Sequence, residues 1–210
     1  MADILQKMAS SLYAGEDEEV AELVQQALDQ GMSPAEILSS GLIAGMDEVG
    51  KDFKAGDLFV PEVLVAARAM SAGMGVLRPL LAAGEVPSAG KYVIGTVKGD
   101  LHDIGKNLVK MMLEGAGFET VDLGTDVEPA AFVDAVREHR PNFVGMSALL
   151  TTTMVNMKTT IEALEEAGLR EGIKIMVGGA PVTDPFAREI GADAYAPDAA
   201  SAVDVARSLR

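Results

Sequence analysis

The sequence predicts an α/β protein of two domains: a four-helix bundle over residues 1–84 and a doubly wound sheet of five parallel strands over residues 91–210. Apolar residues in the first eighty or so positions recur only at helical spacing, whereas beyond residue 91 short β-rich runs alternate with helical stretches. Between the two halves, residues 85–90 mix Gly, Pro and small residues, which is typical of an interdomain linker. A chain of 210 residues is long enough for two compact domains.

The second and third helices carry the clearest local signals. An acidic turn at residues 16–19 precedes apolar residues at three- and four-residue steps, and Gly31 closes this helix. Next, Ser33 supplies a hydroxyl N-cap, Pro34 stands in the first turn, and Glu36 completes the pattern of a capping box. We therefore expect a third helix from there to about Lys54. The apolar positions of the second helix are Val20, Leu23, Val24, Ala27 and Leu28.

A fourth helix is predicted from about Phe59 to Leu81 and completes the bundle. Because the links between the helices are short, we expect an up-and-down arrangement. The apolar stripe of this helix consists of Val63, Ala66, Ala67, Met70 and Met74.

Five short β-rich runs predict the strands of the second domain. They cover residues 92–97, 118–123, 143–146, 173–177 and 192–196. Helical stretches between consecutive strands indicate parallel pairing, with helices on both faces of the sheet. In such sheets ligands bind beyond the carboxyl ends of the strands, where the strand order reverses. For a flavodoxin-like, Rossmann-type order, that point lies between the first and third strands.

Composition excludes several classes of function. With 17 basic and 32 acidic residues the formal charge is -15, which opposes binding to nucleic acid and to anionic membrane surfaces. The absence of Cys removes disulfides, thiolate metal sites and cysteine nucleophiles. No run of about 18 uninterrupted apolar residues and no export signal at the start is present, so we expect a soluble, cytoplasmic protein.

Polar and glycine residues gather in three loops at the predicted edge of the sheet, residues 98–106, 147–153 and 178–181. The first loop contains His102, one of two histidines, with carboxylates at Asp100 and Asp103. A neutral imidazole binds transition metals well, and a carboxylate that accepts the proton of the other ring nitrogen fixes the tautomer. Alternatively, the aspartates cap a helix that begins near Gly105, and His102 is incidental.

The other residues of these loops also allow a structural explanation. Ser147 and the threonines after it would serve as helix caps, and Gly178 and Gly179 would permit a tight turn, although they would also let a bulky ligand lie against the backbone. His139 fits a surface residue at the end of a helix and is assigned no function. A single histidine cannot build an all-protein metal site, because zinc sites take about three or four protein ligands. Any metal at His102 must therefore arrive with most of its ligands attached.

Together, these loops resemble the cobalamin-binding domain of methionine synthases, methyl-transfer corrinoid proteins and some cobalamin-dependent mutases. The D-x-H-x-x-G motif of that family occurs at residues 100–105, its S-x-L element at 147–149 and its G-G element at 178–179, each at a strand end. One such motif is weak, whereas the ordered set is specific. Residues 50–53 and 59–64 are similar to the bundle that precedes this domain in the methyl-transfer members, so the resemblance spans nearly the whole chain.

The resemblance implies that cobalamin binds with its own dimethylbenzimidazole base displaced and its nucleotide tail inserted into the sheet domain. His102 becomes the lower axial ligand of cobalt, Asp100 accepts the proton of the other ring nitrogen, and Thr153, where many relatives carry serine, completes this relay. The other loop residues and the loop after the fifth strand would hold the tail. The cofactor contacts implied are Asp100, Leu101, His102, Asp103, Ile104, Gly105, Ser147, Leu149, Thr151, Thr153, Gly178, Gly179, Met70, Tyr195 and Ala196.

The upper face of the cobalt is expected to be covered, because water and oxidants would consume the strongly nucleophilic reduced corrinoid. The candidates on the bundle are Met46, Phe59, Ala66 and Met70, although such a stripe at helical spacing is more often plain core. A methyl donor and a methyl acceptor must both reach the cobalt. We therefore expect the bundle to move aside about the Gly/Pro-rich segment before Lys91.

The function implied by the resemblance is that of a corrinoid carrier, which is not an enzyme by itself. Cob(I)alamin would accept a methyl group from a substrate-specific methyltransferase, and methylcobalamin would deliver it to a second methyltransferase acting on a pterin or a thiol; a reductive activator is a further expected partner. The alternatives are the small subunit of an adenosylcobalamin-dependent mutase, a cobalamin sensor of gene expression, and a flavin- or phosphate-binding domain on the same fold. The helical half favours methyl transfer, no basic DNA-reading module supports a sensor, and the His102 loop lacks a phosphate-binding glycine pattern.

Overall fold

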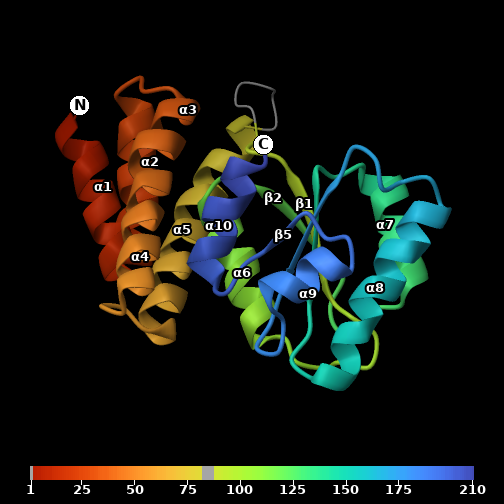
Figure 1. Ribbon diagram of the computed structural model, residues 1–210. Helices are drawn as coiled ribbons and strands as arrows, with labels where there is room; N and C mark the ends of the chain where they lie inside the picture. The colour runs from red at the N-terminus through yellow and green to blue at the C-terminus, as the bar shows by residue number, and fades with distance from the viewer. Residues whose placement is uncertain (1, 82–87) are drawn as a thin grey trace. The chain divides into compact units, whose positions relative to one another are not determined.

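The computed structural model describes residues 2–81 and 88–210, which divide into two compact units (Figure 1). The helical unit comprises the described residues up to Ser88 together with Gly115–Gly117, and the sheet unit comprises Ala89–Glu114 and Phe118–Arg210. Of the predicted linker and hinge, residues 85–87 lie outside the described residues.

The helical unit contains the predicted bundle. Its helices are α1 (Ala2–Ala14), α2 (Asp17–Asp29), α3 (Pro34–Ile37), the π-helical segment η1 (Leu38–Ile43), α4 (Ala44–Ala55) and α5 (Val60–Leu81). The Oγ of Ser33 accepts a hydrogen bond from the Glu36 N–H at 3.2 Å, so the predicted N-cap begins the third helix. From there α3, η1 and α4 follow one another without a break, which confirms the single long helix expected to about Lys54.

Helix α5 packs against the other helices of the helical unit. By length and composition, its stretch Val60–Leu80 could span a membrane, with a mean hydropathy of 1.3. However, α5 packs against α2, and a Cβ placed on Gly73 would lie 3.0 Å from Val20 and 2.9 Å from Leu42. A core helix of a globular unit passes the same test of length and composition, and close packing at Gly73 is what such a helix shows. The buried residues of α5 include Val63, Ala66, Ala67, Ala69, Met70 and Leu77.

The sheet unit is doubly wound. Its strands β1 (Lys91–Thr96), β2 (Glu119–Asp122), β3 (Phe143–Ser147), β4 (Lys174–Gly178) and β5 (Ala194–Tyr195) are parallel in the order β2-β1-β3-β4-β5. This order confirms the predicted flavodoxin-like class, with its reversal between β1 and β3. β5 is shorter than predicted, because it pairs with β4 through two residues only and ends the sheet.

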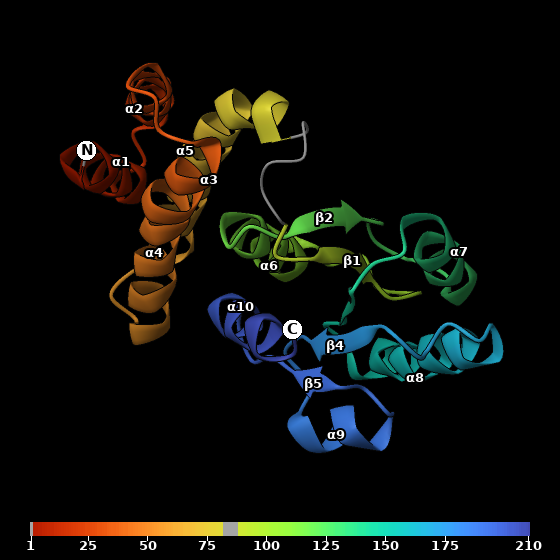
Figure 2. The same ribbon diagram turned by 90° about the horizontal axis from the view of Figure 1, so that it is seen from above.

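Helices cover both faces of the sheet. On one face α6 (Ile104–Gly115) and α10 (Ala199–Ser208) lie together, and on the other lie α7 (Pro129–His139) and α8 (Thr151–Glu166) (Figure 2). The short helix α9 (Asp184–Glu189) adds Ala187 to the apolar core that α7 and α8 form against β1, β3 and β4. The central strands are buried on both sides by this arrangement, which explains their nearly continuous apolar sequences.

Candidate functional site around His102

Three strands end at the same level of the sheet and place their loops side by side. Thr96 at the end of β1 pairs with Ser147 at the end of β3, and Ser147 pairs in turn with Gly178 at the end of β4. The loops after these residues therefore meet at one edge, at the point where the strand order reverses. This is the edge at which the sequence predicts a ligand site.

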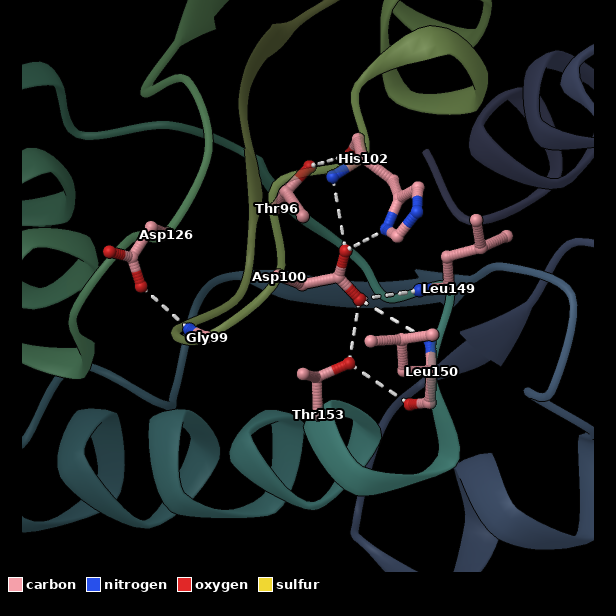
Figure 3. A network of polar contacts seen from close by, with 8 residues as sticks. All are labelled: Thr96, Gly99, Asp100, His102, Asp126, Leu149, Leu150 and Thr153. Carbon is pink, nitrogen blue, oxygen red and sulfur yellow. Dashed lines mark hydrogen bonds and ion pairs between the residues drawn. The ribbon is translucent and has the colours of Figure 1, made fainter.

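The carboxylate of Asp100 is the centre of this edge. It is fully buried, and its Oδ2 accepts hydrogen bonds from Thr153 Oγ1 at 2.6 Å, from the Leu149 N–H at 2.7 Å and from the Leu150 N–H at 3.3 Å (Figure 3). Its Oδ1 accepts the His102 N–H at 3.1 Å and lies 2.7 Å from His102 Nδ1. Burial alone would raise the pKa of Asp100, but these donors outweigh it and hold the pKa well below its ordinary value. Asp100 is therefore a carboxylate at neutral pH.

The imidazole of His102 is oriented by this carboxylate. A charged acceptor beside Nδ1 favours the tautomer with the proton on Nδ1, which leaves the lone pair of Nε2 free. The second ring nitrogen points away from Asp100 (Figure 3), and the side chain is 52% exposed. The ring is thus fixed on one side and open on the other, as a metal ligand must be.

The surroundings of His102 fit a metal that brings its own apolar ligand system. Leu101 and Ile104, which are close to His102 in sequence, are 73% and 77% exposed. Leu149 and Leu150, whose N–H groups bind Asp100, are exposed as well. Exposed apolar residues gathered in this way mark a binding surface. No group of three or more His, Cys, Asp or Glu side chains in the described residues could hold a bare metal ion. A corrinoid, whose macrocycle already binds the cobalt, matches one imidazole on an apolar surface.

The other predicted site residues fall into two groups. Ser147 ends β3, Thr151 begins α8 and is exposed, and Tyr195 and Ala196 lie at the end of β5, so all four are at the same edge of the sheet. Asp103 instead lies directly before α6, and its carboxylate accepts a hydrogen bond from the side-chain amide of Asn107 at 3.0 Å, while its backbone carbonyl accepts the Asn107 N–H at 2.8 Å. That its carboxylate caps a backbone N–H of the helix stays a prediction. Met70 belongs to the helical unit, and its contact with a cofactor stays a prediction.

Gly179 has a structural requirement of its own. Its φ is +129°, and a Cβ at this position would lie 1.8 Å from the carbonyl oxygen of Ala148. Any side chain would therefore collide with the neighbouring loop, whether or not a ligand is bound. Gly178 is less constrained, since a Cβ there would come 3.0 Å from the Ala196 oxygen. The tight-turn interpretation thus explains Gly179, and the role of the pair in making room for a ligand stays a prediction.

Sequence reasoning missed several residues that hold the His102 loop. The buried Thr96 hydroxyl donates to the His102 carbonyl at 2.9 Å, and Asn156 Nδ2 donates to the Lys98 carbonyl at 2.8 Å. Asp126, in the loop after β2, contacts the loop from the other side (Figure 3). The only available signal for Asp126 was its place beyond the end of the second predicted strand, whereas the predicted site residues of the sheet domain follow the first, third, fourth and fifth strands.

An ion pair between the buried Lys106 and the partly exposed Asp122 anchors the helix that follows His102. The Lys106 ammonium, on the first turn of α6, is 2.6 Å from Oδ1 of Asp122 at the end of β2, and Lys110 is 3.2 Å from Oδ2. Burial alone would raise the pKa of Asp122, but Lys106, the Gly124 N–H and Lys110 outweigh it and lower that pKa. The pair therefore fixes α6 to the sheet directly after the His102 loop.

Replacing Asp122 by asparagine is expected to lower the free energy of unfolding by about 2 kcal/mol near neutral pH, because the buried Lys106 ammonium loses its counter-charge. Since folding lowers the pKa of Asp122, wild-type protein keeps this contribution above the ordinary carboxyl pKa of about 4 and loses it as the pH falls below that value. Chemical denaturation of both proteins should therefore show a stability gap that is constant down to about pH 5 and narrows below about pH 4. A gap that stays constant in acid would contradict this assignment.

Comparisons with known proteins identify the family of both units. A family model described as a B12 binding domain matches residues 90–204, and a second model of the same description matches residues 4–78. The trimethylamine corrinoid protein 1 of Methanosarcina acetivorans is 45% identical over 99% of this chain and 97% of its own length. The dimethylamine corrinoid protein 1 of Methanosarcina mazei is 46% identical over 99% of this chain and 96% of its own.

Solved structures give the same result for the fold of the whole chain. A cobalamin-binding protein from Desulfitobacterium hafniense matches with a TM-score of 0.81 and 33% identity over 98% of both chains. The methanol:cobalamin methyltransferase complex MtaBC from Methanosarcina barkeri matches with a TM-score of 0.88 and 31% identity, over 99% of this chain and 79% of that one. Cobalamin, the cofactor that the sequence predicts, is thereby confirmed. The site at His102 and the match of both units to B12-binding models lead to one conclusion: the chain belongs to the family of B12-binding corrinoid proteins.

Proposed function

We propose that the chain carries methyl groups between two methyltransferases, with His102 as the lower axial ligand of its cobalamin. When bound, the cofactor supplies a cobalt that accepts and releases a methyl group. The observation that carries this proposal is the chain of contacts from Thr153 through Asp100 to His102, which presents one oriented imidazole to an open apolar surface. The protein is not an enzyme by itself in this proposal, because the chemistry of substrate selection lies in the partners.

The residues of the relay have distinct tasks. Asp100 holds the proton on Nδ1 of His102 and so keeps Nε2 available as a ligand. The Thr153 hydroxyl donates to the same carboxylate and so shares its negative charge with the imidazole. The relay would therefore hold His102 Nε2 in place for the cobalt that the cofactor would supply.

The partners and the donor are part of the same proposal. One partner is a substrate-specific methyltransferase, the second acts on a pterin or thiol acceptor, and a reductive activator restores the cofactor after oxidation. The names of the relatives favour a methylated amine as the donor, and the cytoplasm is the expected compartment. Phe59, which is 66% exposed at the start of α5, fits the expected cover of the cofactor better than Ala66 and Met70, which are buried.

The test is a transfer assay with the purified chain loaded with cobalamin. Extracts of the source organism grown on trimethylamine, dimethylamine or methanol are supplemented with the loaded protein and the matching 14C-labelled donor. We expect label on the protein-bound corrinoid with a methylated amine, followed by its loss when a thiol or pterin acceptor is added. A chain that binds no cobalamin, or a loaded chain that no donor labels, would overturn the proposal. Catalysis of a rearrangement after loading with adenosylcobalamin would favour the mutase alternative.

A further inference from the structure

Asp126 binds the His102 loop at two consecutive residues. Its Oδ1 accepts a hydrogen bond from the Gly99 N–H at 2.6 Å (Figure 3). Its own N–H donates to the Asp100 carbonyl at 2.9 Å. One residue therefore binds the backbone on both sides of the peptide group that joins Gly99 to Asp100: the N–H before it and the carbonyl after it. This peptide group sets the direction in which the Asp100 side chain leaves the backbone, so the contacts of Asp126 bear on the position of the buried carboxylate.

The backbone of Asp126 is in an unfavourable conformation. Its φ is +54°, and within residues 2–81 and 88–210 Arg140, with a φ of +45°, is the other non-glycine residue with a positive φ. This region costs a non-glycine residue roughly 1 kcal/mol, although Asp tolerates it better than most. The next residue, Val127, pairs with Val97 and donates its N–H to the Thr96 carbonyl at 3.0 Å, so the loop after β2 is fastened to the end of β1. A strained residue held in place in this way calls for a functional explanation.

We propose that Asp126 is a positioning residue, which fixes the Asp100–His102 pair in its ligand geometry before the cofactor binds. This inference rests on the proposed role of His102 as the axial ligand. Without the carboxylate of Asp126, the Gly99 N–H loses its acceptor. The peptide group between Gly99 and Asp100 is then held by the bond of the Asp100 N–H to the Val97 carbonyl, at 3.1 Å, and by the backbone bond of Asp126 to the Asp100 carbonyl. Gly99, with a φ of +80° and no side chain, adds little resistance of its own to a rotation of this peptide group.

Three variants test the side chain of Asp126 and include a control for the relief of a positive φ. Asp126→Gly removes the acceptor and relieves the positive φ, whereas Asp126→Asn keeps both an acceptor oxygen and a side chain that tolerates this φ. Arg140→Gly is the matched control, because it relieves the other positive φ at the carboxyl end of α7. Thermal melting of all three shows how much each change affects the fold alone.

The readout for the loaded protein uses cobinamide, a corrinoid without a nucleotide base, so that any nitrogen ligand comes from the protein. For Asp126→Gly we expect about tenfold weaker binding of cobinamide and a smaller fraction of the Co(II) form with the nitrogen splitting of histidine in its EPR spectrum. Asp126→Asn and Arg140→Gly should both match the wild type in affinity and splitting. Unchanged ligation in Asp126→Gly, beside clear ligation in the wild type, overturns the inference and leaves the proposed function intact. Absence of nitrogen ligation in the wild type defeats the proposed function itself.

A second readout needs no cofactor. Amide hydrogen exchange measured by NMR on the cofactor-free wild type should show protection of the Gly99 N–H, because its hydrogen bond to Asp126 exists before the ligand binds. The protection should persist in Asp126→Asn and disappear in Asp126→Gly. Exchange of this amide in the wild type at the rate of an open loop overturns the inference, whether or not the glycine variant folds.

Discussion

Replacing His102 by alanine is expected to abolish ligation of cobalt by the protein while leaving the fold intact. The side chain is 52% exposed and contributes little to the core, so the free energy of unfolding should change by less than about 1 kcal/mol. Its Nε2 is the nitrogen that the relay leaves free for a metal, and no other nitrogen ligand is assigned to the site. With cobinamide as the probe, the Co(II) EPR spectrum should lose all nitrogen splitting, and affinity should fall by about tenfold to a hundredfold.

Two controls make this result specific. His139→Ala removes the second of the two histidines, which lies in the last turn of α7 and belongs to no part of the site, and should leave ligation unchanged. In wild-type protein grown on 15N-histidine, the nitrogen splitting should change from three lines to two, which identifies a histidine as the ligand. Nitrogen splitting that survives in His102→Ala but vanishes in His139→Ala would place the cofactor elsewhere.

Local sequence patterns predicted most of the fold because each pattern has a local physical cause. The Ser33 hydroxyl caps the third helix, as the capping box indicates, and the β-rich runs coincide with five strands in the expected parallel order. The π-helical segment at Leu38–Ile43 was not predicted. The capping box and the apolar residues there indicate a helix, but they do not indicate which backbone hydrogen-bond pattern the helix has. The shortness of β5 likewise depends on its edge position, which no local pattern reveals.

At the site, the sequence indicated the groups that form the relay but not the groups that orient it. Asp100, His102 and Thr153 were predicted from motifs, and the structure brings them together within hydrogen-bonding distance. The contacts of Thr96, Asp126 and Asn156 with the same loop join residues up to 58 positions apart and depend on backbone φ values and strand register. Such contacts are a property of the folded chain, and a single sequence does not encode them as a local pattern.

Replacing Asp100 by asparagine is expected to combine loss of ligation with a loss of stability of about 2–3 kcal/mol. The carboxylate accepts hydrogen bonds on both oxygens, from His102 on one side and from Leu149, Leu150 and Thr153 on the other. The amide of asparagine has one oxygen, so on one of these two sides its NH2 group, which cannot accept a hydrogen bond, must face the donors. If it faces the loop after β3, buried N–H groups lose their acceptor. If it faces His102, the ring must accept at Nδ1 and carry its proton on Nε2, where it blocks the metal.

Both orientations of the amide are therefore damaging, and two measurements separate them. Chemical denaturation reports the lost hydrogen bonds, and the EPR spectrum of bound cobinamide reports the lost ligand. Thr153→Val removes one donor to the same carboxylate and should cost about 1 kcal/mol while ligation persists. Asp134→Asn, at an exposed carboxylate paired with Arg137, should change stability by less than about 0.5 kcal/mol. Full stability and full ligation in Asp100→Asn would contradict this prediction. Such a result would show that a single acceptor oxygen is enough, and that the charged carboxylate does not set the tautomer of His102.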